Sequence, residues 1–308
     1  LDDLTAFLGA HRIALTIKDE RFDGHPLECR FDGLLHPAQE DAIRRMLPFD
    51  TGVLVAPTGF GKTVLAARLI AERKVNTLVL VHRRSILDQW RECLATFLGM
   101  PLKEIGVFSG EKKKPRGQVD VALIQSLCRK GEVHDLVADY GHLIIDECHH
   151  IPAFTFEQVI RQAKAKYVLG LTATPIRKDG HHPIIIMQCG PIRVRIQSKD
   201  VAEQSRFRHV VFARETQFVS SAETENPDIA SLYGQIANDP HRNTMIIEDV
   251  AAATRAGRSS LVLTERREHL EYLVRELQKC VLHVIVLQGG MGKRQRAAAD
   301  EQLKTLPP

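Results

Sequence analysis

An octapeptide at residues 56–63, A-P-T-G-F-G-K-T, carries the residue types needed to hold a nucleotide phosphate chain. Gly59 and Gly61 let successive backbone N–H groups turn toward phosphate oxygens, and a helix beginning beside them adds the positive end of its dipole. Lys62 is placed to reach the β- and γ-phosphates, and the hydroxyl of Thr63 to meet Mg²⁺. The alternative is a plain glycine turn, but an apolar run before the octapeptide and a helical run after it favour phosphate binding.

Two carboxylates follow a second apolar run. Residues 142–150 read H-L-I-I-D-E-C-H-H, so Asp146 and Glu147 come where a buried strand is expected to end. In a nucleotide-binding sheet, a carboxylate at such a strand end faces the metal across from the phosphate loop. Asp146 is predicted to hold Mg²⁺ through water, and Glu147 to orient and deprotonate the attacking water. Asp-Glu by itself would favour a solvated acidic turn, and the phosphate loop upstream reverses that preference.

Short apolar runs alternate with amphipathic segments around both motifs, and this alternation predicts an α/β fold with a parallel sheet covered by helices on both faces. The predicted strands are Thr51–Ala56, Thr77–His82, Val119–Ile124, His142–Asp146, Tyr167–Thr172 and Pro183–Gln188. The predicted helices are Pro37–Leu47, Lys62–Arg73, Arg84–Leu98 and Thr155–Ala165. Ligands bind at the carboxyl ends of the strands in open sheets of this kind.

The alternation breaks at residues 190–208, which are charged and irregular and predict a connector with a hinge at 199–208. A second, shorter alternation follows, with strands expected at His209–Phe218, Ser260–Thr264 and Val281–Gln288, and helices at Asp228–Ala253 and Glu268–Lys279. The predicted parts are a leader or extension over residues 1–34, a nucleotide-binding lobe over 35–198, and a partial second lobe over 209–308.

The order of these motifs resembles that of the superfamily 2 helicases of the DExH group. Gly59–Thr63 resembles motif I, Asp146–His149 resembles motif II, and Leu171–Pro175 resembles motif III. The resemblance implies two RecA-like lobes with parallel sheets, the second one truncated, and an ATP hydrolase with Mg²⁺ as cofactor. It implies catalytic roles for Lys62, Asp146, Glu147 and His149, ATP contacts from Pro57, Thr58, Gly59, Phe60, Gly61, Lys62 and Thr63, metal contacts from Thr63 and Asp146, and coupling through Thr172 and Thr174.

Shorter elements are similar to the same family. Leu35–Gln39 resembles the upstream element whose glutamine reads adenine, and residues 81–84, 125–127 and 260–266 resemble motifs Ia, Ic and IV. Residues 169–180 resemble the XPB/Ssl-type branch, with bacterial and phage members the most similar. In XPB-like proteins an Arg-Glu-Asp triplet follows this motif, whereas this chain has Arg-Lys-Asp at 177–179, so the charge of the central residue is reversed. Some of the relatives follow a primase-like module, which is therefore an expected fused or associated upstream partner.

Motifs V and VI of the family are not found, and motif VI supplies arginine fingers. An arginine finger is worth about 10³–10⁵ in rate, so we expect the 308-residue chain to bind ATP better than it hydrolyses it. The predicted function is ATP-driven translocation or unwinding of nucleic acid. The alternative is a nucleotide-regulated nucleic-acid-binding module without motor activity. A transporter or GTPase is disfavoured by the Thr172–Pro175 element.

The resemblance also implies nucleic-acid contacts, with DNA favoured over RNA. Motors of this family grip the phosphate backbone largely independently of sequence. The expected contacts are Arg83, Arg84, Gly110, Gln125 and Ser126 in the first lobe and Gly289 and Gly290 in the second. For each of these residues by itself a solvated loop is an equal alternative, and the order of the motifs favours the set. Aromatic residues make up only 6%, and the single tryptophan, Trp90, is expected in the core.

Composition excludes several other classes of protein. The chain is 44% hydrophobic and 26% charged, which is ordinary for a globular domain. It has no run of ~18 consecutive apolar residues, so no membrane partner is expected. Six cysteines form no C-x-x-C pair, which indicates neither a zinc knuckle nor a disulfide framework and predicts a cytoplasmic protein, or a nuclear one in a eukaryote. The net charge of +4 arises within residues 1–200 and is compatible with a polyanionic partner.

Overall fold

The computed structural model describes residues 2–16, 18–110, 112–129, 131–148, 153–174, 182–197, 210–220 and 228–305. The chain divides into two compact units, Leu1–His209 and Val210–Pro308. The predicted hinge at 199–208 lies outside the described residues, as does His149.

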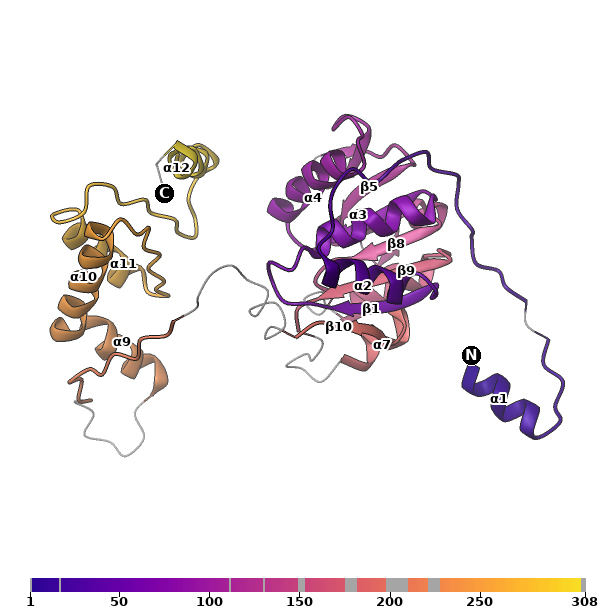
Figure 1. Ribbon diagram of the computed structural model, residues 1–308, viewed down its shortest axis with the longest axis horizontal. Helices are drawn as coiled ribbons and strands as arrows, with labels where there is room; N and C mark the ends of the chain where they lie inside the picture. The colour runs from indigo at the N-terminus through magenta and orange to yellow at the C-terminus, as the bar shows by residue number, and fades with distance from the viewer. Residues whose placement is uncertain are drawn as a thin grey trace. The chain divides into compact units, whose positions relative to one another are not determined.

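The first unit is built on an eight-stranded sheet in the order β10-β1-β9-β8-β2-β5-β3-β4 (Figure 1). All neighbouring strands pair in parallel except the last two, β3 and β4, which are antiparallel. The strands are β1 (Thr51–Val55), β2 (Thr77–Val81), β3 (Ile105–Phe108), β4 (Lys113–Lys114), β5 (Val119–Leu123), β8 (His142–Ile145), β9 (Tyr167–Thr172) and β10 (Ile192–Arg195). Parallel pairing therefore brings the carboxyl ends of seven strands to one edge.

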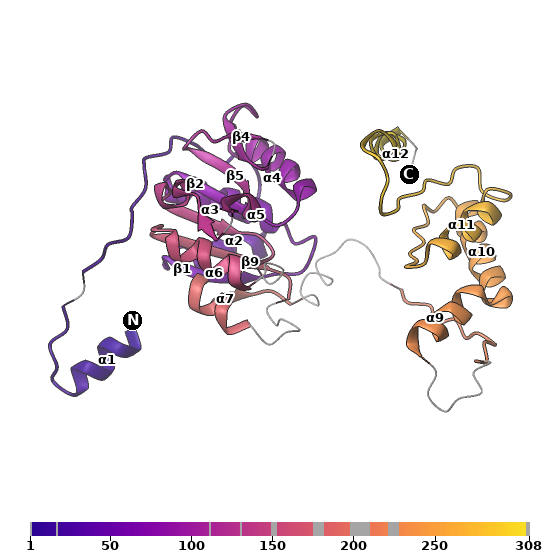
Figure 2. The ribbon, with the colours of Figure 1, turned by 180° about the vertical axis from the view of Figure 1, so that it is seen from behind.

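Helices cover both faces of this sheet (Figures 1 and 2). One face carries α2 (Pro37–Met46), α3 (Lys62–Arg73) and α4 (Arg84–Phe97), and the other carries α5 (Ile124–Leu127), α6 (Ala153–Gln162) and α7 (His182–Cys189). The second face also carries the short ladder β6 (Cys128–Arg129) and β7 (Glu132–Val133) and the 3₁₀ helix η1 (Asp135–Asp139). A central strand is consequently buried on both sides: in β2, Val79 and Val81 face one core and Leu78 and Leu80 the other.

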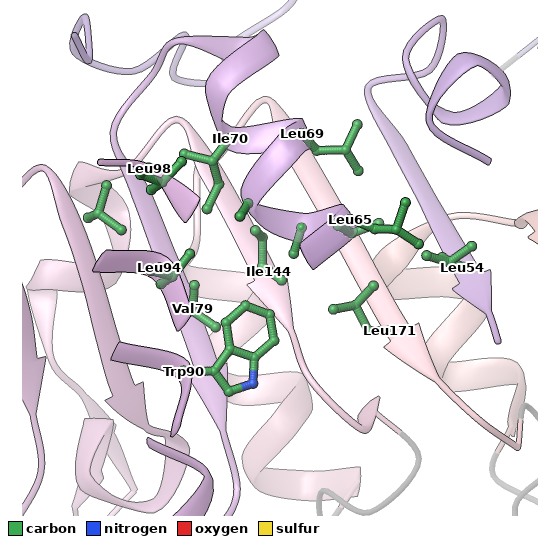
Figure 3. Close-up of a cluster of buried hydrophobic side chains, with 14 of the residues drawn as sticks. Leu54, Leu65, Leu69, Ile70, Val79, Trp90, Leu94, Leu98, Ile144 and Leu171 are labelled. Carbon is green, nitrogen blue, oxygen red and sulfur yellow. The ribbon is translucent and has the colours of Figure 1, made fainter. Parts of the chain in front are cut away.

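The core under α3 and α4 is shown in Figure 3. Helix α4 contributes Leu87, Trp90 and Leu94, whose spacing of three and four residues puts them on one face of the helix. Burying an apolar side chain of this size stabilises the fold by about 1.5–3 kcal/mol. Trp90 is only 2% exposed, so its predicted place in the core is confirmed.

Five of the six predicted strands and all four predicted helices of the first unit are confirmed, with small differences at their ends. The sixth strand is wrong, because residues 183–188 lie within helix α7. A continuous apolar run such as P-I-I-I-M-Q does not distinguish a buried strand from a buried helix by periodicity. The predicted connector at 190–208 is corrected at its start, since residues 192–195 form edge strand β10. Strand β3, which follows Pro101, was not predicted from the sequence.

The segment before α2 contains helix α1 (Asp2–Ala10) and a stretch that contacts the first unit. Phe22 forms a parallel bridge with Ala165, and Pro26 forms an antiparallel bridge with Val75. Leu27 is 3% exposed and belongs to the core under α2, α3 and α4. This part of the predicted leader therefore packs on the sheet-bearing unit.

The second unit contains α9 (Ile229–Asn238), α10 (Pro240–Arg255), α11 (Arg267–Leu277) and α12 (Lys293–Thr305). The helix predicted over 228–253 is divided in two because Asp239 caps the start of α10, its carboxylate accepting from the N–H of Arg242 at 2.6 Å, and Pro240 follows. The strands predicted at 209–218, 260–264 and 281–288 are not formed by the described residues among them, which pair with no neighbouring strand. A β-strand is stabilised by its ladder, and alternation in the sequence cannot supply the partner.

No helix of the part of the chain that the structure describes is both long and apolar enough to cross a bilayer.

Candidate active site

The strand order assembles the predicted nucleotide site at one edge of the sheet. Strand β9 lies between β1 and β8, so the loop after β1, the end of β9 at Thr172 and the residues after β8 are neighbours. The N–H of Ala56 donates to the carbonyl of Thr172 at 2.9 Å, and the N–H of Asp146 donates to the carbonyl of Leu80 at 3.0 Å. Motifs that lie about ninety residues apart in the sequence are brought together in this way.

The loop between β1 and α3 has the geometry of a phosphate cradle. Gly59 and Gly61 have φ of 85° and 89°, a region that glycine enters without strain. A Cβ placed on Gly59 would meet no atom within 4 Å, so space above the loop is open to a phosphate group. Gly61 stands at the N-cap of the twelve-residue helix α3, whose first N–H groups and dipole favour an anion. The loop therefore fits the phosphates of a nucleotide.

Gln39 binds this loop to helix α2. Its amide Nε2 donates to the carbonyl of Phe60 at 2.8 Å, and its Oε1 accepts from the backbone N–H of His36 at 3.1 Å. Both bonds are buried or half-buried, and the His36 ring packs edge-on against the Phe60 ring. A Cβ on Gly61 would lie 2.6 Å from Gln39 Nε2, so only glycine leaves room for this approach. Gln39 thus lies beside the predicted ATP site as a bridge between two elements.

Lys62 and Glu147 form an ion pair at the centre of the site. Nζ of Lys62 lies 3.2 Å from Oε1 of Glu147, and it also donates to the carbonyl of Ala56 at 3.1 Å. Their side chains are only 10% and 22% exposed. Glu147 has a φ of 46°, in the left-handed region where a side chain costs about 1–2 kcal/mol. Strain of this kind is concentrated at functional sites.

Asp146 is held next to this pair and is 8% exposed. Its Oδ2 accepts a buried hydrogen bond of 2.7 Å from the indole Nε1 of Trp90. Burial raises the pKa of the Asp146 carboxyl above its usual value, while the hydrogen bonds from Trp90 and from the Glu147 backbone act in the opposite direction. The contact with Trp90 was not predicted, because the two residues are 56 positions apart and nothing local in the sequence joins them.

The remaining predicted site residues are placed as follows. Thr63 stands in the first turn of α3 and is half-buried, Pro57 is half-buried, and Thr58 is exposed in the loop. The hydroxyl of Thr63 and the carboxylate of Asp146 are oxygen donors, the ligand type that Mg²⁺ prefers. Among the described residues no group of three or more His, Cys, Asp or Glu side chains could hold a metal ion.

Thr172 and Thr174 form a closed turn after β9. The hydroxyl of Thr172 donates to the carbonyl of Thr174 at 2.9 Å, and the N–H of Thr174 donates back to that hydroxyl at 3.1 Å. Thr172 is fully buried, and its carbonyl accepts from Ala56 next to the phosphate loop. Thr172 is therefore in contact with the phosphate loop, and Thr174 is joined to it through Thr172.

The predicted nucleic-acid contacts of the first unit lie along the same edge. Arg83 and Gln125 are exposed, and Nε2 of Gln125 donates to the carbonyl of His82 at 3.1 Å, joining the ends of β2 and β5. Arg84 and Gly110 are exposed and Ser126 is half-buried. The other two predicted contacts, Gly289 and Gly290, belong to the second unit, where both are exposed and Gly290 has a φ of 84°.

Parts of the chain are similar to known proteins. Residues 33–177 match the family described as type III restriction enzyme, res subunit. The DNA 3'-5' helicase XPB of Kineococcus radiotolerans is 34% identical over 59% of this chain and 34% of its own length. The DNA 3'-5' translocase XPB2 of Sulfurisphaera tokodaii is 32% identical over 61% of this chain and 42% of its own length. The chain therefore spans well under half the length of these two curated relatives.

A solved structure supports the fold. The helicase Lhr of Mycobacterium smegmatis, bound to single-stranded DNA and AMP-PNP, superposes with a TM-score of 0.54 and 21% identity, covering 87% of this chain and 38% of that one. In its phosphate loop, its acidic strand end and its curated relatives, the chain is similar to the superfamily 2 helicases and translocases of the DExH group, in the branch that contains the XPB and Rad25 proteins.

Proposed function

We propose that this chain is the ATP-binding and ATP-hydrolysing part of a translocase or helicase that acts on DNA. The observation that carries the proposal is the meeting of Lys62 and Glu147, 3.2 Å apart, between a phosphate cradle and the buried carboxylate Asp146. A cation for the phosphates, a metal carboxylate and a base for water are the parts that hydrolysis of a nucleoside triphosphate requires.

In this proposal each residue of the site has a separate role in ATP hydrolysis. The backbone of the loop and Lys62 bind and orient the triphosphate, and Thr63 and Asp146 hold Mg²⁺, which neutralises charge on the β- and γ-phosphates when bound. Glu147 orients a water molecule and accepts its proton. Thr172 and Thr174, whose turn contacts the loop through Ala56, would transmit the state of the nucleotide to the predicted nucleic-acid contacts at the same edge of the sheet.

DNA is favoured over RNA because the two curated relatives described above are named for DNA. The same names favour a motor over a nucleotide-regulated binding module. Such an enzyme would work where DNA lies, in the cytoplasm of a bacterial or phage-infected cell or in a eukaryotic nucleus.

Two measurements on the chain test the proposal. We expect Mg²⁺-dependent ATP binding by calorimetry and ATP hydrolysis that DNA stimulates more than RNA of the same length and sequence. Stimulation by RNA alone would overturn the choice of DNA. Absence of nucleotide binding would overturn the whole proposal.

A further inference from the structure

We propose that Trp90 is a positioning residue for the magnesium carboxylate Asp146, in addition to being part of the hydrophobic core. The inference rests on the proposed function, because it concerns how the chain prepares Asp146 for Mg²⁺. The contact itself is independent of that function and can be tested without nucleotide.

The geometry of the pair is that of a strong, dry hydrogen bond. The distance from Trp90 Nε1 to Asp146 Oδ2 is 2.7 Å, and the two residues are 2% and 8% exposed. A bond between an N–H and an ionised carboxylate is shorter and roughly twice as strong as one between neutral groups. Removal from water strengthens it further.

Packing does not require a donor at this position. Figure 3 shows the indole among apolar neighbours on α4 and the sheet, which include Val79, Leu94 and Ile144. A side chain of the same shape without the N–H would satisfy those contacts. The indole N–H is the one polar atom of the side chain, and it donates to the carboxylate at the strand end. We infer that this N–H selects one orientation of the Asp146 carboxylate.

The arrangement is the one by which proteins orient metal ligands generally. A carboxylate that binds a metal, directly or through water, is itself held by a hydrogen bond, and loss of such a partner typically costs 10–100-fold in metal affinity or activity. Asp146 has one such partner on helix α4 and another in the Glu147 backbone. Removing the indole N–H should therefore weaken Mg²⁺ binding while leaving the phosphate loop intact.

The chain offers an unusually clean probe, because Trp90 is its single tryptophan. In protein labelled with ¹⁵N, the one indole N–H resonance reports on this bond without assignment. We expect a downfield resonance that exchanges slowly with solvent, and an upfield shift with faster exchange in Asp146→Ala. An indole resonance that is unchanged in Asp146→Ala would overturn the contact.

The metal is tested by calorimetric titration of ADP at increasing Mg²⁺ with wild type and Trp90→Phe. We expect the Mg²⁺ concentration for half-maximal tightening of ADP binding to rise about tenfold in Trp90→Phe, with ADP affinity in EDTA unchanged. Leu94→Val is the matched control, since it loosens the same face of α4 and keeps the indole N–H. Equal Mg²⁺ dependence in wild type and Trp90→Phe, or an equal loss in Leu94→Val, would overturn the proposal.

Two further outcomes are distinguishable. If Trp90→Phe does not fold, benzothienylalanine at position 90 keeps the shape of the indole and replaces its N–H by sulfur, and the same tenfold change is expected. If wild type binds no nucleotide at any Mg²⁺ concentration, the proposed function fails and the metal role fails with it. If wild type binds Mg²⁺ and ADP but loss of the indole N–H changes nothing, the proposed function stands and the role of Trp90 fails alone.

Discussion

The ammonium of Lys62 lies 3.2 Å from Oε1 of Glu147, so the cation predicted to meet the phosphates is paired with the carboxylate predicted to activate water. With side-chain exposures of 10% and 22%, each charge compensates the other where water is scarce. A triphosphate would offer Lys62 a new anionic partner. We expect binding of ATP to release the Glu147 carboxylate for water, so that the base becomes available only when the substrate is present.

Lys62→Ala should weaken ATP binding by at least about tenfold, because a charge-assisted hydrogen bond contributes about 1.5–3 kcal/mol. Calorimetry gives the affinity, and a melting curve checks the fold. Lys103→Ala, which removes an exposed lysine of the same unit, is the control and should bind ATP as wild type does. Unchanged affinity in folded Lys62→Ala would contradict the assignment of the phosphate loop.

Glu147→Gln should keep Mg·ATP binding and lower the rate of hydrolysis by about 10²-fold or more, the contribution of a positioned general base. The amide has the size of the carboxylate but cannot accept a proton from water. Single-turnover release of phosphate measures the chemical step. The matched variant Glu104→Gln changes an exposed glutamate outside the site and should hydrolyse ATP at the parent rate. A Glu147→Gln variant with the parent rate would exclude Glu147 as the base.

Gly61→Ala should lower both the free energy of unfolding and the affinity for ATP. The alanine would meet two penalties, a left-handed φ of 89° and a Cβ only 2.6 Å from Gln39 Nε2. Gly99→Ala is the matched control, because Gly99 has a φ of 61° but an open surrounding, so it carries only the backbone cost of about 1–2 kcal/mol. Denaturant titration should give a larger loss for Gly61→Ala. An equal loss of free energy of unfolding in the two variants would mean that the Gln39 side chain moves aside at no cost.

Arg83→Ala should weaken binding to single-stranded DNA about equally for every sequence. Loss of one phosphate contact should reduce the slope of log K against log[salt] by about 0.7 for a single strand. The control is Arg44→Ala, which removes an exposed arginine of helix α2. Fluorescence anisotropy at four salt concentrations measures both slopes. A salt slope for Arg83→Ala equal to that of wild type would show that Arg83 does not contact the DNA backbone.

The sequence predicts the sheet and its loops well for a physical reason. Strands such as β2, covered on both faces, must be apolar throughout, and the turn residues that follow them stand out by their chemistry. The same argument fails for α7, whose apolar run suits either element, and for the described parts of the predicted strands in the second unit, which have no pairing partner.

The hydrogen bonds between side chains inside the site could not be predicted from the sequence. The bond from Trp90 to Asp146 depends on how α4 rotates over the sheet, and the bond from Gln39 to Phe60 depends on how α2 meets the loop. Neither the rotation of α4 over the sheet nor the approach of α2 to the loop follows from local residue types. Motifs indicate which residues carry chemistry, whereas their orienting partners are fixed by tertiary packing.

His142 predicts how the stability of the first unit depends on pH. Its side chain is buried at the start of β8, with Nδ1 3.4 Å from the hydroxyl of Thr77 and the ring edge-on to Tyr167. Burial, helped by the charge of Arg73, lowers the pKa of His142 from 6.5 to about 3. The folded state thus keeps the imidazole neutral while the unfolded state takes up a proton, so stability is lost as the pH falls from about 6.5 toward 3.

The variant His142→Phe keeps a ring beside Tyr167 and removes the titration. Well below pH 6.5 the wild type should lose about 1.4 kcal/mol per pH unit through this group, and the variant should lack that contribution. Urea titrations at pH 7, 6 and 5 give the free energy of unfolding for each protein. His11→Phe changes an exposed histidine of α1 and should leave the slope of the wild type intact. Because only the unfolded wild type takes up a proton at position 142, wild type should lose stability faster than His142→Phe between pH 7 and 5. An equal loss in the two proteins would show that His142 does not cause the pH dependence.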